Sequence, residues 1–437
     1  MCQKRQILPG RPPPRRIPMM SPRLRRVAVA LALTVLVAAP AASRGQTPAN
    51  SDAAIAAMLD ERARAVRDGD LAAFDRTMAG GRAEFVARER TGFRRMRLLP
   101  IGDYRLEPNR EEFGDLARDR DRVGGFDETR IVQAVERIAL RGFDATAENE
   151  DLYLTVVRAG ASWTVYDDAG VEDIGLLSIR HLWDFGEIEM KQSDGILVVH
   201  HPAERAAAGP VLTMAQRARA TARRGWPLGW TDPIVVMIPS TVGELERILQ
   251  TTFDLTQFVA FAASSVDRAD GYRLTGHRIF LHWPNFRRYS ARFQEQVLAH
   301  EFTHLATRAI AGPNITAIFD EGIAQVYGEG GGETTQMARR VRARTLPGAL
   351  VPDWYFTAGP RDDIFLAYEE AASFIAYLNG RFGRDAGARA YRALGTIDPV
   401  THGTWRYHLD RVTVSLFGES FPALERAWLE SVRKRFS

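Results

Sequence analysis

Two neighbouring stretches, VLAHEFTHLATRAI (residues 297–310) and NITAIFDEGIAQVYGE (residues 314–329), decide how the second half of this 437-residue chain folds and what it can bind. In the first stretch His300 and His304 are four residues apart. On a helix this spacing puts both imidazoles on one face, where they can reach a common point. The stretch therefore raises the question of a metal site carried on a helix.

The residues around the two histidines favour a helix. Apolar residues recur at helical spacing, and Gly312-Pro313 ends the pattern. The apolar positions are Phe293, Val297, Leu298, Leu305 and Ile310. The simpler alternative is an amphipathic helix that carries two surface histidines and holds no metal.

Glu301 directly follows the first histidine, so the segment HEFTH matches the pattern H-E-x-x-H. In that pattern the histidines bind zinc and the glutamate acts as a general base. A catalytic zinc needs a third protein ligand and an open position for water. Glu321, 17 residues after His304 on a second predicted helix, is the natural third ligand. Gly322 would let the two helix backbones approach closely. The simpler reading makes Glu321 a solvated helix residue, with Asp320 as the alternative ligand.

The remaining histidine pairs lack this spacing on a helix. His200 and His201 are adjacent on a predicted strand, where neighbouring side chains face opposite ways. His277 and His282 are five residues apart on another predicted strand, so they also diverge. We interpret all four as structural.

The first 43 residues differ from the rest of the chain. Eight Lys or Arg and no acid lie in residues 1–26, and the apolar run VAVALALTVLVAAPAAS follows at residues 27–43. A basic start, a short apolar run and small residues at its exit predict a secretory signal peptide over residues 1–43, with Met20 as an alternative start. The other interpretation is an uncleaved membrane anchor, although the run is short for a bilayer span. Both predict a secreted or extracytoplasmic protein, in contact with a membrane only through an uncleaved leader.

Removal of this leader changes the electrostatic character of the chain. The mature protein would carry 50 basic and 54 acidic residues, so its formal net charge would be −4 instead of +4. No basic stripe with interleaved aromatic residues is present, which excludes nucleic-acid binding. The single cysteine, Cys2, lies in the leader, so His and carboxylate side chains would have to hold any metal.

The mature chain predicts an α+β protein with two domains. Residues 44–172 show helical periodicity first and strand-like segments after Pro100, which predicts a curved antiparallel sheet wrapped around a helix. Residues 175–437 predict a mixed sheet followed by a helical lobe. Within them, residues 182–204 read as a strand hairpin, and the long helix that follows can break at Gly209-Pro210.

Several segments resemble a known family. HEFTH followed by DEGIAQVYG (residues 320–328) resembles the compact gluzincin zinc metallopeptidases of the peptidase MA clan, whose second helix has a WxxEGxAxY-type signature. AYEEAASFIAYLNGRFG (residues 367–383) and VTVSLFGESFPALERAWLESVRKR (residues 412–435) resemble the later helices of that family. Residues 51–168 resemble an NTF2/SnoaL-like (cystatin-like) domain, which is found ahead of such peptidase domains in exported bacterial proteins.

The resemblance implies a role for individual residues. His300, His304 and Glu321 would be zinc ligands and Glu301 the general base. The chain departs from the family at Gln325, where an aspartate often orients a ligand histidine. Gln325 can accept the same hydrogen bond, but it has no charge. The ligand histidine would then be less basic and would hold zinc less tightly.

If the zinc site is active, a substrate and further site residues can also be predicted. The protein would be an exported zinc peptidase acting on a peptide or protein, and the strand HRIFLHW (residues 277–283) could pair with an extended substrate backbone. Tyr368 is the candidate donor to the oxyanion, in competition with His402, His408 and Tyr327.

Two other classes of function compete with the peptidase. Gln325 keeps open a metal-containing but inactive relative that binds peptides or partners. A cavity in the amino-terminal sheet that binds a small molecule or partner is the other alternative.

Overall fold

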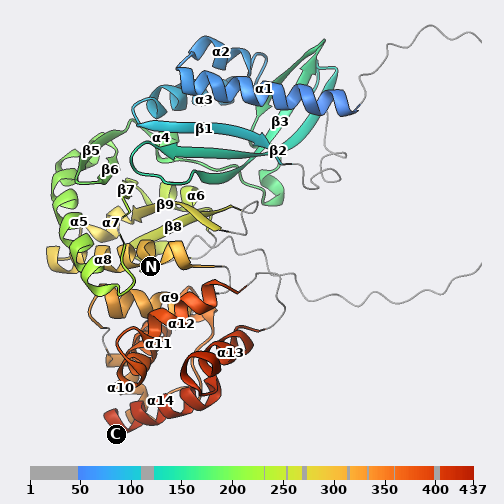
Figure 1. Cartoon of the computed structure of the whole chain (residues 1–437). Coiled ribbons are helices and arrows are strands. Elements are labelled where there is room, and N and C mark those ends of the chain that lie inside the picture. Colours follow the sequence, from blue (N-terminus) through green and yellow to red (C-terminus); the bar gives the residue numbers. More distant parts are fainter. Residues whose placement is uncertain are drawn as a thin grey trace, which may run out of the picture.

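The computed structural model describes residues 48–109, 123–230, 232–251, 254–267, 273–312, 315–331, 334–358, 360–397 and 404–437. It has the predicted α+β fold, with a curled antiparallel sheet, a separate mixed sheet and a helical lobe (Figure 1). The predicted signal peptide, residues 1–43, lies outside the described residues. Within those residues, none of the helices combines the length and the apolar character that a membrane span requires.

The amino-terminal part consists of three helices and a curled sheet. The helices are α1 (Pro48–Asp68), α2 (Leu71–Arg76) and α3 (Ala83–Met96). The antiparallel strands, adjacent in chain order, are β1 (Ile101–Pro108), β2 (Glu128–Leu140), β3 (Glu148–Ala159) and β4 (Ser162–Asp167). Gly160 has a φ of 60° in the predicted tight turn between β3 and β4. Figure 1 shows α1 lying along the sheet.

The second sheet has the strand order β5-β6-β7-β9-β8 and mixes parallel and antiparallel pairs. Its strands are β5 (Glu189–Ser193), β6 (Ile196–His200), β7 (Ile234–Ile238), β8 (Ala260–Asp267) and β9 (Arg273–Leu281). The helices between and beside them are α4 (Leu182–Phe185), α5 (Arg205–Gly225), α6 (Val242–Leu249) and α7 (Trp283–Phe286).

Two local predictions in this region are wrong. The segment read as the start of a strand hairpin forms the short helix α4 instead, and the hairpin begins only at β5. Helix α5 runs through Pro210 without a break. Pro210 is the sixth residue of α5, so the helix lacks one backbone hydrogen bond there but continues through it.

The second sheet is buried on both faces. Alternate residues of its strands point to opposite sides, as the period of a strand requires. Val198 and Val236 belong to the core shared with the helices, whereas Leu197 and Val235 belong to the core shared with the amino-terminal part. This sheet is therefore the middle layer of the molecule, and its central strands β6 and β7 are nearly continuous apolar runs for that reason.

The helical lobe forms the carboxyl-terminal third of the chain (Figure 1). Its helices are α8 (Ala291–Thr307), α9 (Ala317–Ile323), α10 (Thr335–Arg342), α11 (Arg361–Phe382), α12 (Ala386–Gly395), α13 (Trp405–Phe417) and α14 (Phe421–Phe436). Ser290 caps α8 by accepting a hydrogen bond from the backbone N–H of Phe293. Helix α8 packs against α5 and β8, so it joins the second sheet to the lobe.

A buried ion pair connects the amino-terminal part to the second sheet. Arg278 of β9 donates two hydrogen bonds to Asp144 in the turn after β2, with lengths of 2.6 and 2.7 Å. The Arg278 side chain is fully buried, and Glu148 lies 3.4 Å from its guanidinium. A buried bidentate pair contributes geometric specificity, so it holds the two parts in one orientation.

The space between the two sheets is filled rather than hollow. His181, stacked on Trp183, lies 2.7 Å from a carboxylate oxygen of Glu136, and the Tyr104 hydroxyl donates to the other oxygen. Burial lowers the pKa of His181, but the Glu136 charge outweighs it and raises that pKa to about 9. The cavity beside this network is about 10 Å³, room for about one water molecule. A small-molecule site at this place would require the sheets to separate.

Candidate metal centre

Three predicted side chains meet at one point between α8 and α9. His300 Nε2 and His304 Nε2 are 3.2 Å apart, and Glu321 Oε2 lies 3.1 Å from the first and 3.5 Å from the second. We call His300, His304 and Glu321 the ligand cluster. All three side chains are buried, and their facing atoms could hold a metal ion.

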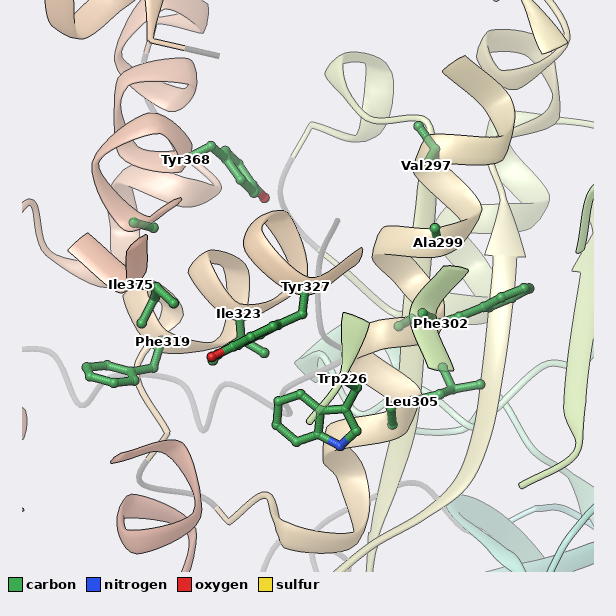
Figure 2. Packing of buried hydrophobic residues seen from close by; sticks show 14 of the residues in the cluster. Trp226, Val297, Ala299, Phe302, Leu305, Phe319, Ile323, Tyr327, Tyr368 and Ile375 are labelled. Carbon is green, nitrogen blue, oxygen red and sulfur yellow. The ribbon is translucent and has the colours of Figure 1, made fainter. Parts of the chain in front are cut away.

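The position of the ligand cluster follows from how α8 and α9 pack. Both histidines meet Glu321 of α9 from one face of α8. Phe302, about half a turn from each of them, points toward the sheet (Figure 2). On the other side of α9, Phe319 lies beside Ile375 of α11 (Figure 2). Apolar packing on both sides therefore holds α8 and α9 close to each other.

Two glycines allow these close contacts. A Cβ on Gly322 would lie 2.6 Å from the carbonyl oxygen of Ala371, so this glycine lets α9 approach α11. The expectation that Gly322 brings α9 against α8 is therefore wrong. Gly328 has that role, because a Cβ there would lie 2.8 Å from the carbonyl oxygen of Ala299 and 3.0 Å from the His300 Cα.

Each ligand histidine has a carboxylate on its other ring nitrogen. His300 Nδ1 lies 2.8 Å from Glu329 Oε1, and His304 Nδ1 lies 3.3 Å from Asp320 Oδ2. The Tyr391 hydroxyl of α12 donates to the other Asp320 oxygen at 2.8 Å. Asp320 thus faces the outer nitrogen of a histidine, and Glu321 has the oxygen that could bind a metal ion. Such carboxylates fix the ring orientation and raise the basicity of a metal ligand.

Without a metal, the neighbouring carboxylates favour the protonated forms of His300 and His304. Burial lowers the pKa of His300, but hydrogen bonds to Glu321 and Glu329 outweigh it and raise that pKa to about 10. Burial raises the pKa of Glu321, and the positive charge of His304, together with the His300 hydrogen bond, outweighs it and lowers that pKa. In the metal-free protein a proton therefore takes the place that a divalent cation would fill, and metal binding would displace it.

Glu301 lies where the H-E-x-x-H pattern puts the general base. It follows His300 on α8 and is fully buried, and its negative charge contributes to the raised pKa of His300. A buried carboxylate next to a ligand is suited to take a proton from a water held by the metal.

The four candidates for the oxyanion donor differ in their surroundings. Tyr368 is buried on α11, with its ring edge-on to Phe356 at 5.2 Å, and Figure 2 shows its ring directed toward the side on which α8 lies. The Tyr327 hydroxyl donates to Asn379 and to the carbonyl oxygen of Arg384, so it is committed to the lobe. His408 is buried on α13, and His402 lies outside the described residues. Tyr368 remains the predicted donor.

The prediction that HRIFLHW pairs with substrate is wrong. This segment forms most of β9, which lies between β7 and β8 and is hydrogen-bonded to both. Its backbone groups are already used there. The edge of the sheet on this side is β8, whose carboxyl-terminal end meets the amino-terminal part through Ser265, which accepts a hydrogen bond from the backbone N–H of Asn149.

The four histidines that we interpreted as structural have partners within the fold. His200 and His201 each bond a backbone carbonyl oxygen through Nδ1, at 2.8 and 2.7 Å. His277 faces the Ser264 hydroxyl, and His282 caps α7. None of these four belongs to the ligand cluster.

A buried acid supports the segment that leads to the ligand helix. Glu370 of α11 accepts a hydrogen bond from the backbone N–H of Val351, and Asp353, two residues on, accepts one from Ala317 at the start of α9. Burial, with the charges of Glu425 and Glu369, raises the pKa of Glu370 to about 8 and outweighs Arg340, which lowers it.

Glu370→Gln is expected to make the stability of the protein less dependent on pH. Because the pKa of Glu370 is raised from 4.5 to about 8 on folding, its stabilising contribution is complete below pH 4.5 and is lost as the pH rises through about 8. Each unit of pKa shift corresponds to about 1.4 kcal/mol, so the variant should gain a few kcal/mol of stability relative to wild type at pH 9. Urea unfolding at pH 5, 7 and 9 measures this. Equal slopes with pH for both proteins would contradict it.

Comparison of the sequence with protein-family models and with curated proteins gives no match.

Proposed function

We propose that the protein is a zinc-dependent peptidase that acts outside the cytoplasm on peptides or proteins. The observation that carries the proposal is the convergence of His300 Nε2, His304 Nε2 and Glu321 Oε2 beside the buried Glu301. Two imidazoles and a carboxylate are a donor set suited to zinc, whereas calcium and magnesium prefer oxygen ligands.

The distances in the ligand cluster support this choice of metal. Donor atoms bonded to a tetrahedral zinc at 2.0–2.2 Å are about 3.3–3.6 Å apart. The corresponding distances here are 3.2, 3.1 and 3.5 Å. The cluster is thus already near the size that zinc needs, and three ligands leave one position for water.

Each residue then has a distinct task. Zinc, when bound, lowers the pKa of a coordinated water to about 7 and polarises a substrate carbonyl. Glu301 takes the proton of the attacking water and passes it to the leaving amine. Tyr368 would donate to the developing oxyanion from the lobe side. Asp320 and Glu329 keep the imidazoles oriented.

Glu329 bears on the alternative of an inactive relative. That alternative depended on Gln325, an uncharged residue expected to hold a ligand histidine weakly. His300 faces the carboxylate of Glu329 at 2.8 Å, so the histidine has a charged partner in spite of Gln325. This favours the active enzyme over an inactive relative.

Removal of metal is expected to abolish hydrolysis reversibly. Mature protein should cleave denatured casein, lose this activity after dialysis against a chelator, and regain it with one equivalent of zinc. The carboxylates and imidazoles of the cluster would then pair with each other, as they do here, so the fold should survive the treatment. Far-UV circular dichroism serves as the control. Unchanged hydrolysis in protein shown to contain no metal would refute the proposal.

A further inference from the structure

Glu329 is placed to accept a hydrogen bond from a ligand histidine, the role that was expected for Gln325. A metal-binding histidine usually donates its second ring N–H to a carboxylate, carbonyl or water, and this partner sets its orientation. His300 is fully buried, and its Nδ1 lies 2.8 Å from Glu329 Oε1. The question is why a residue eight positions after the ligand Glu321 reaches this atom.

The chain forms one turn of π-helix at Ala324–Gly328, directly after α9. We call this turn the π-turn. In a regular α-helix, residues eight positions apart are rotated by about 80°, and residues seven apart by only about 20°. A π-turn accommodates one extra residue. It therefore brings Glu329 onto nearly the same side as Glu321, so one segment supplies both a ligand atom and the carboxylate behind another ligand.

Gly328 makes the short distance possible. A side chain at this position would meet the Thr303 hydroxyl at 2.7 Å and the Ala299 carbonyl oxygen at 2.8 Å, both on α8. Only a glycine lets the segment lie this close to α8 one residue before Glu329. The Gly331 backbone N–H, which donates to the carbonyl oxygen of Gln325 at 3.1 Å, closes the turn after it.

The Glu329 contact is also shielded. The Glu329 side chain is 20% exposed and that of His300 is fully buried, so the hydrogen bond between them is protected from most of the solvent. Charge-assisted hydrogen bonds in such places are shorter and stronger than neutral ones. Gln325 is itself buried, one turn after Glu321, but Glu329 is the residue that meets His300 Nδ1.

We propose that Glu329 is the positioning residue for His300: delivered by the π-turn and Gly328, its carboxylate holds Nδ1 so that Nε2 faces the metal. The inference rests on the metal site of the proposed function and adds the residue that sets its affinity. It also implies that an aspartate at position 325 would add nothing.

Zinc affinity of the full mature protein, measured by competition with a chromophoric chelator, tests this role. Glu329→Gln and Glu329→Ala should weaken binding about 10- to 100-fold, with glutamine less harmful because its amide oxygen still accepts a hydrogen bond. Gly328→Ala should weaken binding in the same direction. Gln325→Asp should not strengthen zinc binding. Glu295→Gln should have no effect on zinc binding, because Glu295 of α8 pairs with Arg217 of α5 outside the ligand cluster.

The spectrum of the cobalt-loaded protein distinguishes a change in ligand geometry from a loss of protein stability. The visible absorption of the Co²⁺-loaded protein reports ligand geometry, and we expect a changed band shape in the Glu329 variants only. Wild-type affinity and spectrum in both Glu329 variants would overturn the inference and leave the peptidase proposal intact. Weakened metal binding in these variants together with no hydrolysis by the zinc-loaded wild type would overturn the peptidase proposal and support the positioning role.

Discussion

Glu301→Gln should lower the rate of peptide hydrolysis by about 10²- to 10⁴-fold, the usual contribution of a general base. Glutamine has nearly the same shape as glutamate and can occupy the same buried position, but it does not accept a proton. The ligand cluster does not include Glu301, so zinc content should stay at one equivalent. The change separates the chemistry of the site from the binding of its metal.

The measurement is kcat on a quenched fluorescent peptide, with zinc determined by elemental analysis of the same samples. Glu295→Gln is the matched control, because it makes the same substitution on the same helix in an exposed ion pair. Its kcat should equal that of wild type. Undiminished turnover by the Glu301 variant would exclude this residue as the base, whereas a loss of zinc would show that its role is structural.

His304→Ala should remove the metal itself. The ligand cluster has three members, and two ligands do not complete a protein zinc site. Changes to the partner of a ligand already cost about 10- to 100-fold in affinity, so loss of the ligand should cost more than about 100-fold. The variant should therefore be purified with little zinc and should not hydrolyse casein.

Stability gives a second measure of the same change. Ligand binding to the folded state stabilises it by about 2.7 kcal/mol at a free concentration of 100 times the dissociation constant. Added zinc should raise the Tm of wild type and leave that of His304→Ala unchanged. His408→Ala, on α13, is a control that removes a buried histidine outside the ligand cluster. An equal rise of Tm with zinc in wild type and in His304→Ala would show that the cation binds elsewhere.

Much of the site was predictable because its main residues are close in the sequence. The spacing of His300 and His304 determines that they share a helix face, and a short connection brings the next helix back. Local periodicity also predicted most strands and helices, including the four strands of the curled sheet. These features depend on neighbours within one or two turns, which a pattern can report.

Other features depended on contacts between distant segments. The sequence pattern predicted that Gly322 packs against α8, whereas it packs on α11. It also predicted that the strand HRIFLHW could pair with substrate, although two strands flank β9. Glu329 went unnoticed because its distance from Glu321 does not fit a regular helix. An acidic residue after Gly328, at the end of the glutamate helix, is the signal that could have indicated it.

The sequence by itself determined which residues could form a metal site and that the chain has an α+β fold, since helical and strand periodicity are local properties. Only the tertiary structure decided that the nitrogens of His300 and His304 and the oxygen of Glu321 meet within 3.5 Å, and that Glu329 lies behind His300. The reason is that packing against α5 and α11, together with an irregular turn, sets the distance between α8 and α9. No periodicity encodes that distance, because it is the sum of many contacts between residues far apart in the chain.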